Sequence, residues 1–301
     1  MSEVLIKKEP ALKKIAKILI KVVITILCFW YISNKIDFIQ TIDSIKKANW
    51  LYLFAALLLL MFSKLLSAFR LNIYFRNIHL PIPAWQNIKL YWLGMFYNLF
   101  LPGAISGDAY KVIYLKRKMD APYKKTSAAV LLDRFSGLLS VGILLAISGM
   151  MVLPGWWMDI LLFSGSFVAI AGLYLVVKYF MADFLAGFWP AFIWGMGVQL
   201  AQVICLYFIL QSMHVETDFA TWLFIFLVAS VVAVLPLSLG GGLGTREFVF
   251  VTGAEYFLLN QQTGLTASLI FFVLTVISSV GGAYFIFKDP CQEPKTKFRN
   301  V

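Results

Sequence analysis

The sequence predicts an all-α, polytopic membrane protein, and three observations support this prediction. Hydrophobic residues make up 61% of the chain, whereas a typical soluble domain has roughly 45–50% apolar residues. Apolar stretches of about 20 residues, the length that a helix needs to cross a bilayer, recur along the sequence. No long hydrophilic region remains for a soluble domain. We therefore expect one transmembrane domain, with a basic N-terminus at 1–14, a membrane region at 15–287 and a tail at 288–301.

Six segments are long and apolar enough to be full spans. The first follows a lysine-rich N-terminus but has no small-residue cleavage site after it, so we expect a retained helix rather than a signal peptide. Aromatic residues lie near many span ends, as is typical of membrane–water interfaces. The predicted spans are 15–33, 50–69, 126–153, 159–178, 188–211 and 264–287.

The distribution of basic residues predicts the orientation. Lysines and arginines concentrate in the N-terminus, in the segments 70–89 and 111–125, and in the tail, which the positive-inside rule assigns to the cytoplasm. We expect both termini inside, in a multi-pass protein of the plasma membrane. The net charge of +11 then indicates anionic lipid partners, and we expect no nucleic-acid partner.

Two further apolar stretches are interrupted by residues that break helices. The first runs over 85–100, breaks at 101–108 and continues to 115, while the second runs over 221–234, breaks at 235–244 and continues to 256. Their arms are short, which favours re-entrant hairpins, although two full spans would give the same orientation. Each hairpin lies between two spans, so halves of about 50–153 and 188–287 form a predicted inverted repeat. In secondary transporters, paired interrupted helices indicate a binding site at the bilayer midplane.

The composition of the breaks indicates what they could bind. Proline and glycine stop a helix, and the freed backbone groups must then face protein, water or a polar ligand. A helix that restarts after a break directs its N-terminal N–H groups toward the gap, where they bind phosphate well. The alternative is a pair of kinks whose charges pair locally. The residues expected to form the breaks are Pro102, Pro236, Gly240, Gly241 and Gly242.

Other polar residues within the spans leave alternatives open. Arg134 could line the cytoplasmic mouth of a cavity or form an interfacial pair with Asp133, and Arg70 could contact a headgroup or simply extend to the interface. Gln199 and Gln202 could line the cavity or bind helices together. The cysteines and histidines have no metal-site spacing, so we expect neither a metal nor a cofactor.

The order of these motifs resembles the lysylphosphatidylglycerol synthase transmembrane region family, a group of flippase-like membrane domains such as the N-terminal part of the multiple peptide resistance factor. The resemblance covers roughly residues 50–287, with Lys111 and Asp133 as conservative departures where Arg and Glu are usual. It implies lipid binding or translocation. We expect no aminoacyl-transfer domain, because little sequence follows the last span. The candidate lipid- or phosphate-binding residues are Arg70, Asn98, Gly103, Gly107, Asp108, Lys111, Asp133, Arg134, Gly244, Arg246 and Glu247.

Three functions compete at this point. The leading hypothesis is a non-enzymatic translocase for a phospho- or polyprenyl lipid, in which basic side chains attract the headgroup and N–H groups near Gly103 and Gly244 bind its phosphate. Asp108 and Glu247 would hold the cations or carry a proton. The alternatives are a membrane enzyme that uses one of these carboxylates as a general base, and an accessory subunit of a separate lipid-modifying enzyme.

Overall fold

The structure of the protein is a computed structural model. It describes residues 38–80, 82–101, 105–234 and 242–290, together with Val23, Ile26, Leu27 and Trp30. Within these residues the chain forms α-helices and short 3-10 helices but no β-strand. The all-α prediction is therefore confirmed. Apart from those four residues, the predicted span 15–33 lies outside the described part of the chain.

The chain folds into a series of long helices and two hairpins of shorter helices. Five helical segments are long and apolar enough to cross a membrane, and they match five of the six predicted spans. The elements are α2 (Phe38–Lys47), α3 (Trp50–Asn77), α4 (Ala84–Phe100), α5 (Ser106–Met119), α6 (Tyr123–Val152), α7 (Trp156–Phe180), η1 (Ala182–Gly187), α8 (Phe188–Ser212), α9 (Phe219–Val234), α10 (Thr245–Tyr256), α11 (Gln261–Val280), η2 (Gly281–Ala283) and α12 (Tyr284–Phe287).

Two boundaries differ from the prediction. Helix α3 continues to Asn77 instead of ending at 69, so Arg70 lies inside a helix. The sequence from 70 to 77 contains neither glycine nor proline, and nothing in it stops a helix. Helix α2 occupies most of the predicted loop 34–49 and ends with Lys46 and Lys47, whose charges suit a helix C-terminus.

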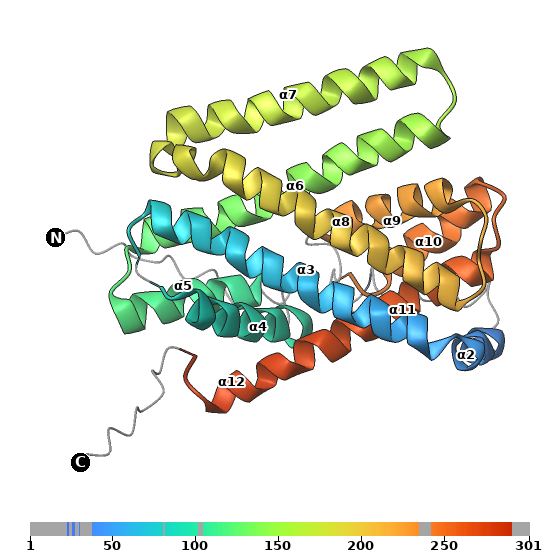
Figure 1. Cartoon of the computed structure of the whole chain (residues 1–301), viewed down its shortest axis with the longest axis horizontal. Helices are drawn as coiled ribbons and strands as arrows, with labels where there is room; N and C mark the ends of the chain where they lie inside the picture. Colours follow the sequence, from blue (N-terminus) through green and yellow to red (C-terminus); the bar gives the residue numbers. More distant parts are fainter. Residues whose placement is uncertain are drawn as a thin grey trace.

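Helices α3 and α8 pack along each other in the centre of the molecule (Figure 1). Helices α6 and α11 flank them, and the hairpins α4–α5 and α9–α10 complete the bundle. Helix α7 stands at the periphery in Figure 1 and contacts α6 and η1. Val177 is its one buried residue, so almost the whole of α7 is available to face lipid.

The helix contacts agree with a division into two similar halves. Helix α6 packs against α9, and α11 packs against α4 in the same way. Helix α5 contacts α6 as α10 contacts α11, and α3 contacts α6 as α8 contacts α11. Each of these contacts therefore has a counterpart when α3, α4, α5 and α6 are matched with α8, α9, α10 and α11 in that order. The inversion of the two halves relative to a membrane stays a prediction.

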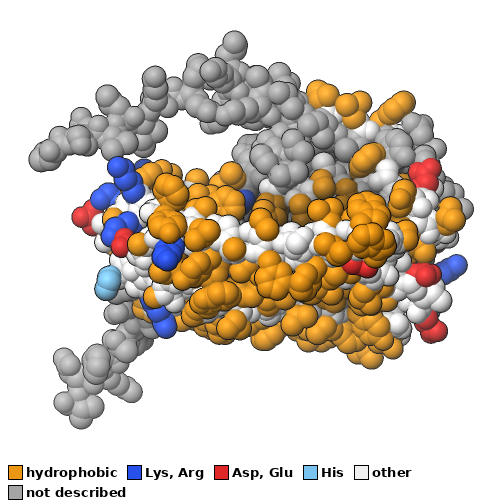
Figure 2. Space-filling view, turned by 90° about the horizontal axis from the view of Figure 1, so that it is seen from above, with side chains coloured by type: hydrophobic (Ala, Val, Ile, Leu, Met, Phe, Trp, Pro, Cys, Tyr) orange, Lys and Arg blue, Asp and Glu red, His pale blue; other side chains and the backbone are white. Residues whose placement is uncertain are grey.

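The surface is divided into an apolar belt and two charged ends (Figure 2). Lysines and arginines gather mainly at one end, and acidic side chains lie mostly at the other. Large exposed hydrophobic residues such as Phe62, Trp157 and Phe167 belong to the spanning helices. The basic end is the one that the positive-inside rule assigns to the cytoplasm, and this orientation also stays a prediction.

The two breaks lie where the sequence indicates them. Helix α4 ends at Phe100 and α5 begins at Ser106, while α9 ends at Val234 and α10 begins at Thr245. At 1.5 Å per residue, even the 17-residue α4 is only about 25 Å long, less than the ~30 Å hydrocarbon core. Pro102, Gly103, Pro236, Gly240 and Gly241 lie outside the described residues.

Gly242 belongs to the second break and shows why glycine is needed there. Its φ of +100° is a conformation that side chains other than glycine rarely adopt. A Cβ atom at this position would lie 2.7 Å from the Cβ of Ala233 at the end of α9. The chain therefore passes too close to α9 for any larger residue at this position.

Candidate functional site

A cavity of about 350 Å³ lies in the centre of the helix bundle. Its lining comes from eight helices: α3, α4, α5, α6, α8, α9, α10 and α11. Both hairpins contribute, since Asp108 comes from α5 and Arg246 from α10. Lys64 is near the middle of the 28-residue helix α3, and Gln199 is near the middle of α8. The cavity therefore lies near mid-depth of these two helices, and its position at the bilayer midplane stays a prediction.

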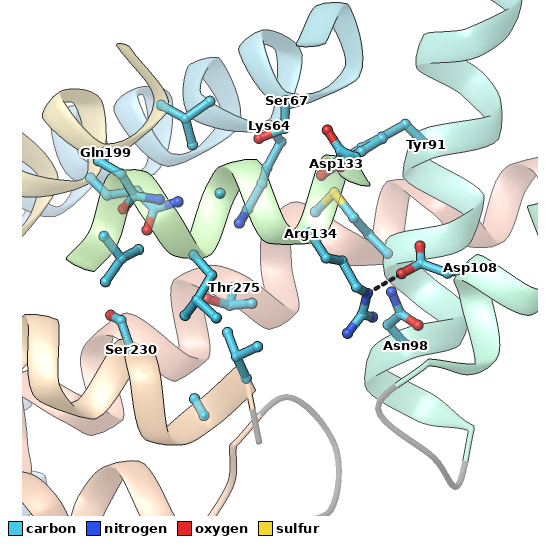
Figure 3. A pocket seen from close by; sticks show the side chains of 18 of the residues that line it. Lys64, Ser67, Tyr91, Asn98, Asp108, Asp133, Arg134, Gln199, Ser230 and Thr275 are labelled. Carbon is cyan, nitrogen blue, oxygen red and sulfur yellow. Dashed lines mark hydrogen bonds and ion pairs between the residues drawn. The ribbon is translucent and has the colours of Figure 1, made fainter. Parts of the chain in front are cut away.

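The first cluster of charges is built around Asp108, in the first turn of α5. Its two carboxylate oxygens bind different cations: Oδ1 accepts a hydrogen bond from Lys111 Nζ at 2.9 Å, and Oδ2 accepts one from Arg134 Nε at 2.5 Å. Figure 3 shows Arg134 reaching from α6 toward Asp108. A carboxylate in the first turn also interacts favourably with the helix dipole. Asp108 thus joins α5 to α6.

A close contact between two glycines positions this cluster. A Cβ atom on Gly107 would lie 1.8 Å from the carbonyl oxygen of Gly94, so α4 and α5 approach closely only because both residues are glycine. The Gly107 N–H donates to Asn98 Oδ1 at 2.8 Å, which satisfies one of the free donors at the start of α5. Lys111 Nζ lies 4.2 Å from the ring centroid of Tyr91 on α4, within the range of a cation–π interaction.

The second cluster joins α3 to α6. Arg70 Nε donates to Asp133 Oδ1 at 2.7 Å, and both side chains are buried. The alternative in which Arg70 extends to the interface is therefore wrong, and Asp133 pairs with Arg70 rather than with its neighbour Arg134. The Arg70 Nη1 atom is buried without a hydrogen-bond partner. This pair could be missed from sequence because its members are 63 residues apart.

At the second hairpin, Arg246 and Glu247 have different surroundings. The Gly244 N–H donates to Glu247 Oε2 at 2.7 Å, and Ser268 Oγ donates to Glu247 Oε1 at 3.1 Å. Glu247 is 0% exposed and closes the N-terminus of α10. The expectation that the Gly244 N–H binds phosphate is therefore not met, because this donor already serves Glu247.

Arg246 instead faces the cavity. Its guanidinium carbon lies 4.3 Å from the ring centroid of Phe271 on α11, and its Nε atom is buried without a hydrogen-bond partner. The described residues include no carboxylate in an ion pair with it. Glu247 forms no ion pair with Arg246, since both Glu247 oxygens are engaged elsewhere.

Lys64 is a cavity residue that the sequence prediction missed. In Figure 3 its side chain extends from α3 into the cavity, with Gln199 on one side and Arg134 on the other. Within the described residues it forms no ion pair. The signal that could have revealed it is a single lysine in the middle of an apolar span, since ionisable residues at membrane depth usually face a cavity.

The cavity has an excess of positive charge. The five basic side chains that line it are Lys64, Arg70, Lys111, Arg134 and Arg246, and the two carboxylates are Asp108 and Asp133. Glu247 is adjacent but faces the backbone of α10. Such a cavity favours an anionic ligand.

Most of the predicted site residues meet in this cavity. Gln199 and Gln202 also line it, which supports the cavity alternative for both, as do the unpredicted Ser67, Tyr91, Ser230 and Thr275. Gly107, Gly244 and Glu247 act behind the cavity wall as packing or capping residues, and Gly103 lies outside the described residues. The predicted residues that line the cavity are Arg70, Asn98, Asp108, Lys111, Asp133, Arg134 and Arg246.

No metal site is evident in the part of the chain that the structure describes, because it contains no group of three or more His, Cys, Asp or Glu side chains. The polar groups of the cavity are instead arginine, lysine, amide and hydroxyl donors. Arginine and lysine are the side chains that bind phosphate groups in proteins. The donors that line the cavity are thus of the kinds that bind anions.

An apolar crevice of about 400 Å³ lies between α6 and α7. Phe135, Gly142, Leu161 and Gly165 contribute to its lining, and Leu138 lines both this crevice and the polar cavity. Gly142 and Gly165 leave this space open, since a Cβ atom at either position would have no atom within 4 Å. The crevice and the cavity thus meet at α6, where Leu138 lines both.

Comparison with known proteins agrees with these observations. Residues 18–189 and 182–282 match the family described as "Lysylphosphatidylglycerol synthase TM region". The chain is also similar to the "UPF0104 membrane protein PH1989" of Pyrococcus horikoshii, with 27% identity over 132 residues. That match covers 43% of this chain and 38% of the length of the Pyrococcus protein.

Proposed function

The chain belongs to the lysylphosphatidylglycerol synthase transmembrane region family, and on this basis we propose that it binds a phosphate-bearing lipid and moves it between the leaflets of the cell membrane. The lipid is a phospholipid or a polyprenyl phosphate. Its headgroup enters the central cavity, and the two hairpins form the walls on either side.

The observation that carries this proposal is the positively charged cavity near mid-depth, to which both hairpins contribute. A headgroup phosphate cannot cross the hydrocarbon core without compensation, because an isolated charge there is very costly. Arginine and lysine donors can replace its hydration. A cavity lined by such donors suits a lipid headgroup, whereas a helix bundle with only a structural role does not require one.

The crevice between α6 and α7 accounts for the other part of a lipid. Hydrocarbon chains have to remain in apolar surroundings while the headgroup crosses. Because Leu138 lines both spaces, a lipid could place its headgroup in the cavity and a chain in the crevice, on opposite sides of one helix. This arrangement distinguishes a lipid from a soluble anion.

Translocation can be measured with purified protein in liposomes that carry a panel of labelled phosphate-bearing lipids. We expect faster lipid movement than in protein-free vesicles. Arg246→Ala should slow it about tenfold or more, since hydrogen bonds to a charged group contribute roughly 1.5–3 kcal/mol. Lys178→Ala, at an exposed position on α7, is the matched control. Equal movement with and without protein across the whole panel would refute the proposal.

An enzymatic role has less support from the geometry. A general base must be able to accept a proton, but Asp108 is held by two cations and Glu247 by a backbone N–H and a hydroxyl. An accessory role predicts a different result for the same variant. Arg246→Ala would leave the association of the protein with a lipid-modifying enzyme unchanged. Copurification with such an enzyme, without any lipid movement, would favour that role.

A further inference from the structure

Two basic side chains in the cavity stand outside the ion pairs of the described residues. Arg70, Lys111 and Arg134 each form an ion pair with Asp133 or Asp108. Lys64 and Arg246 form none with any described residue. Lys64 is close enough to Arg246 and Arg70 to be repelled by both. The charge of Lys64 is therefore not balanced by an ion pair with its described neighbours.

We propose that Lys64 and Arg246 form an anion subsite that selects a headgroup with two negative charges, namely a phosphate monoester or a diphosphate. This inference rests on the proposed function and specifies its substrate class. The subsite lies between α3 and α10, so one residue comes from a spanning helix and the other from the second hairpin. The Nε atom of Arg246, buried and without a partner, is a donor that a phosphate oxygen would satisfy.

Charge counting supports a ligand with two charges rather than one. Five basic groups line the cavity, and Asp108, Asp133 and the adjacent Glu247 together supply three negative charges. The region as a whole therefore has two excess positive charges, and Lys64 and Arg246 are its two cations outside the ion pairs of the described residues. A dianion would neutralise the region, whereas a phosphodiester with one charge would leave one buried cation uncompensated, which is costly.

The side-chain chemistry points in the same direction. Arginine offers a planar set of donors for two phosphate oxygens, and lysine supplies a compact charge that can rotate toward a third. Arg246 is only 9% exposed and is held against Phe271, so its position is fixed before a ligand arrives. Lys64 is half-buried and has a flexible stem. The pair thus combines a fixed donor with an adjustable one.

The binding test uses the full-length protein in nanodiscs and three lipids with the same chains. Phosphatidic acid carries about 1.5–2 negative charges near pH 7, because a phosphate monoester has a second pKa of about 6. Phosphatidylglycerol carries one charge and phosphatidylcholine none overall. We expect the affinity to fall in that order. Lys64→Met and Arg246→Met should each weaken phosphatidic acid binding about 30-fold or more and reduce its advantage over phosphatidylglycerol.

A stability measurement separates a ligand site from a structural role. If Lys64 serves a ligand, Lys64→Met removes a repelled cation and should raise the thermal midpoint of the ligand-free protein while binding is lost. If Lys64 serves the fold, the midpoint should fall instead. Lys178→Met on α7 is the control, and both its midpoint and its binding should remain unchanged. Inorganic pyrophosphate as a competitor tests whether the subsite needs the lipid or only its phosphates.

The outcomes are distinguishable from failure of the proposed function. Equal binding of phosphatidic acid and phosphatidylglycerol by the native protein would overturn the subsite, even if both lipids are translocated. Unchanged selectivity in Lys64→Met would also overturn it. Conversely, selective binding without any lipid movement in liposomes would support the subsite and refute translocation. Displacement by pyrophosphate alone, with no affinity for phosphatidic acid, would reassign the subsite to a soluble anion.

Discussion

Replacing Asp133 by alanine should strongly destabilise the protein, because it leaves Arg70 buried without a counter-charge. The two side chains are only 6% and 9% exposed, and Nε lies 2.7 Å from Oδ1. Arg70 also has a buried Nη1 atom that lacks a hydrogen-bond partner already. Asp133 is the carboxylate that forms an ion pair with Arg70 among the described residues.

The expected loss is about 3–5 kcal/mol of unfolding free energy, which is the usual cost of removing one partner of a buried ion pair. A Coulomb estimate agrees in size. Two unit charges 4 Å apart attract each other by about 4 kcal/mol at an effective dielectric constant of 20. The loss should exceed that for an exposed pair such as Lys125–Asp183, where removal of Asp183 should cost about 1 kcal/mol or less.

Thermal or denaturant unfolding of the purified protein in detergent measures this difference. Asp133→Glu keeps the charge and should retain most of the stability, while Asp183→Ala is the matched control at an exposed pair. The double variant Arg70→Met with Asp133→Ala removes both charges and should recover much of the loss. If Asp133→Ala is as stable as Asp183→Ala, the buried pair does not hold α3 to α6 and the reasoning fails.

Two further predictions concern the hairpins. Gly107→Ala should misplace α5, since the new Cβ would meet the Gly94 carbonyl oxygen at 1.8 Å, and we expect a loss of about 1–3 kcal/mol together with impaired lipid binding; a variant with native melting and binding would contradict this. Glu247→Gln should cost about 1–3 kcal/mol, because the neutral amide accepts more weakly from the Gly244 N–H and the Ser268 hydroxyl, and an unchanged denaturation midpoint would show that the cap is dispensable.

The spans could be predicted from sequence because hydrophobicity is a local property of the chain. A run of about 20 apolar residues needs no partner to indicate a membrane helix, and five such runs are helices in the structure. The breaks could be located for the same reason, since proline and glycine act on their own backbone. The predicted span ends at 69, before Arg70 and Arg76, but α3 continues to Asn77 because charged residues do not by themselves stop a helix.

The identity of the charge partners could not be predicted, because pairing depends on packing between distant segments. Asp133 precedes Arg134 in sequence, yet the helix directs the two side chains to different neighbours: Asp133 to Arg70 and Arg134 to Asp108. Likewise Glu247 follows Arg246 but turns back to cap its own helix. Adjacent residues on a helix point about 100° apart. Proximity in sequence therefore does not identify the ion-pair partner of a charged residue on these helices.

The two halves contribute unequally to the cavity, and this inequality has a functional consequence. The first half supplies four of the five lining cations and both lining carboxylates, whereas the second supplies Arg246. Arg70 lies toward the end of α3 that carries Arg76, and Arg134 lies in the half of α6 that begins with Lys124 and Lys125, and both arginines are already paired. Lys64 and Arg246 are unpaired. Under the proposed function, a headgroup that enters from the basic end meets the ion-paired cations first and the two cations outside an ion pair afterwards. The attraction for an anion therefore increases inward, and the charges of the cavity are distributed asymmetrically even though the helices of the two halves are arranged alike.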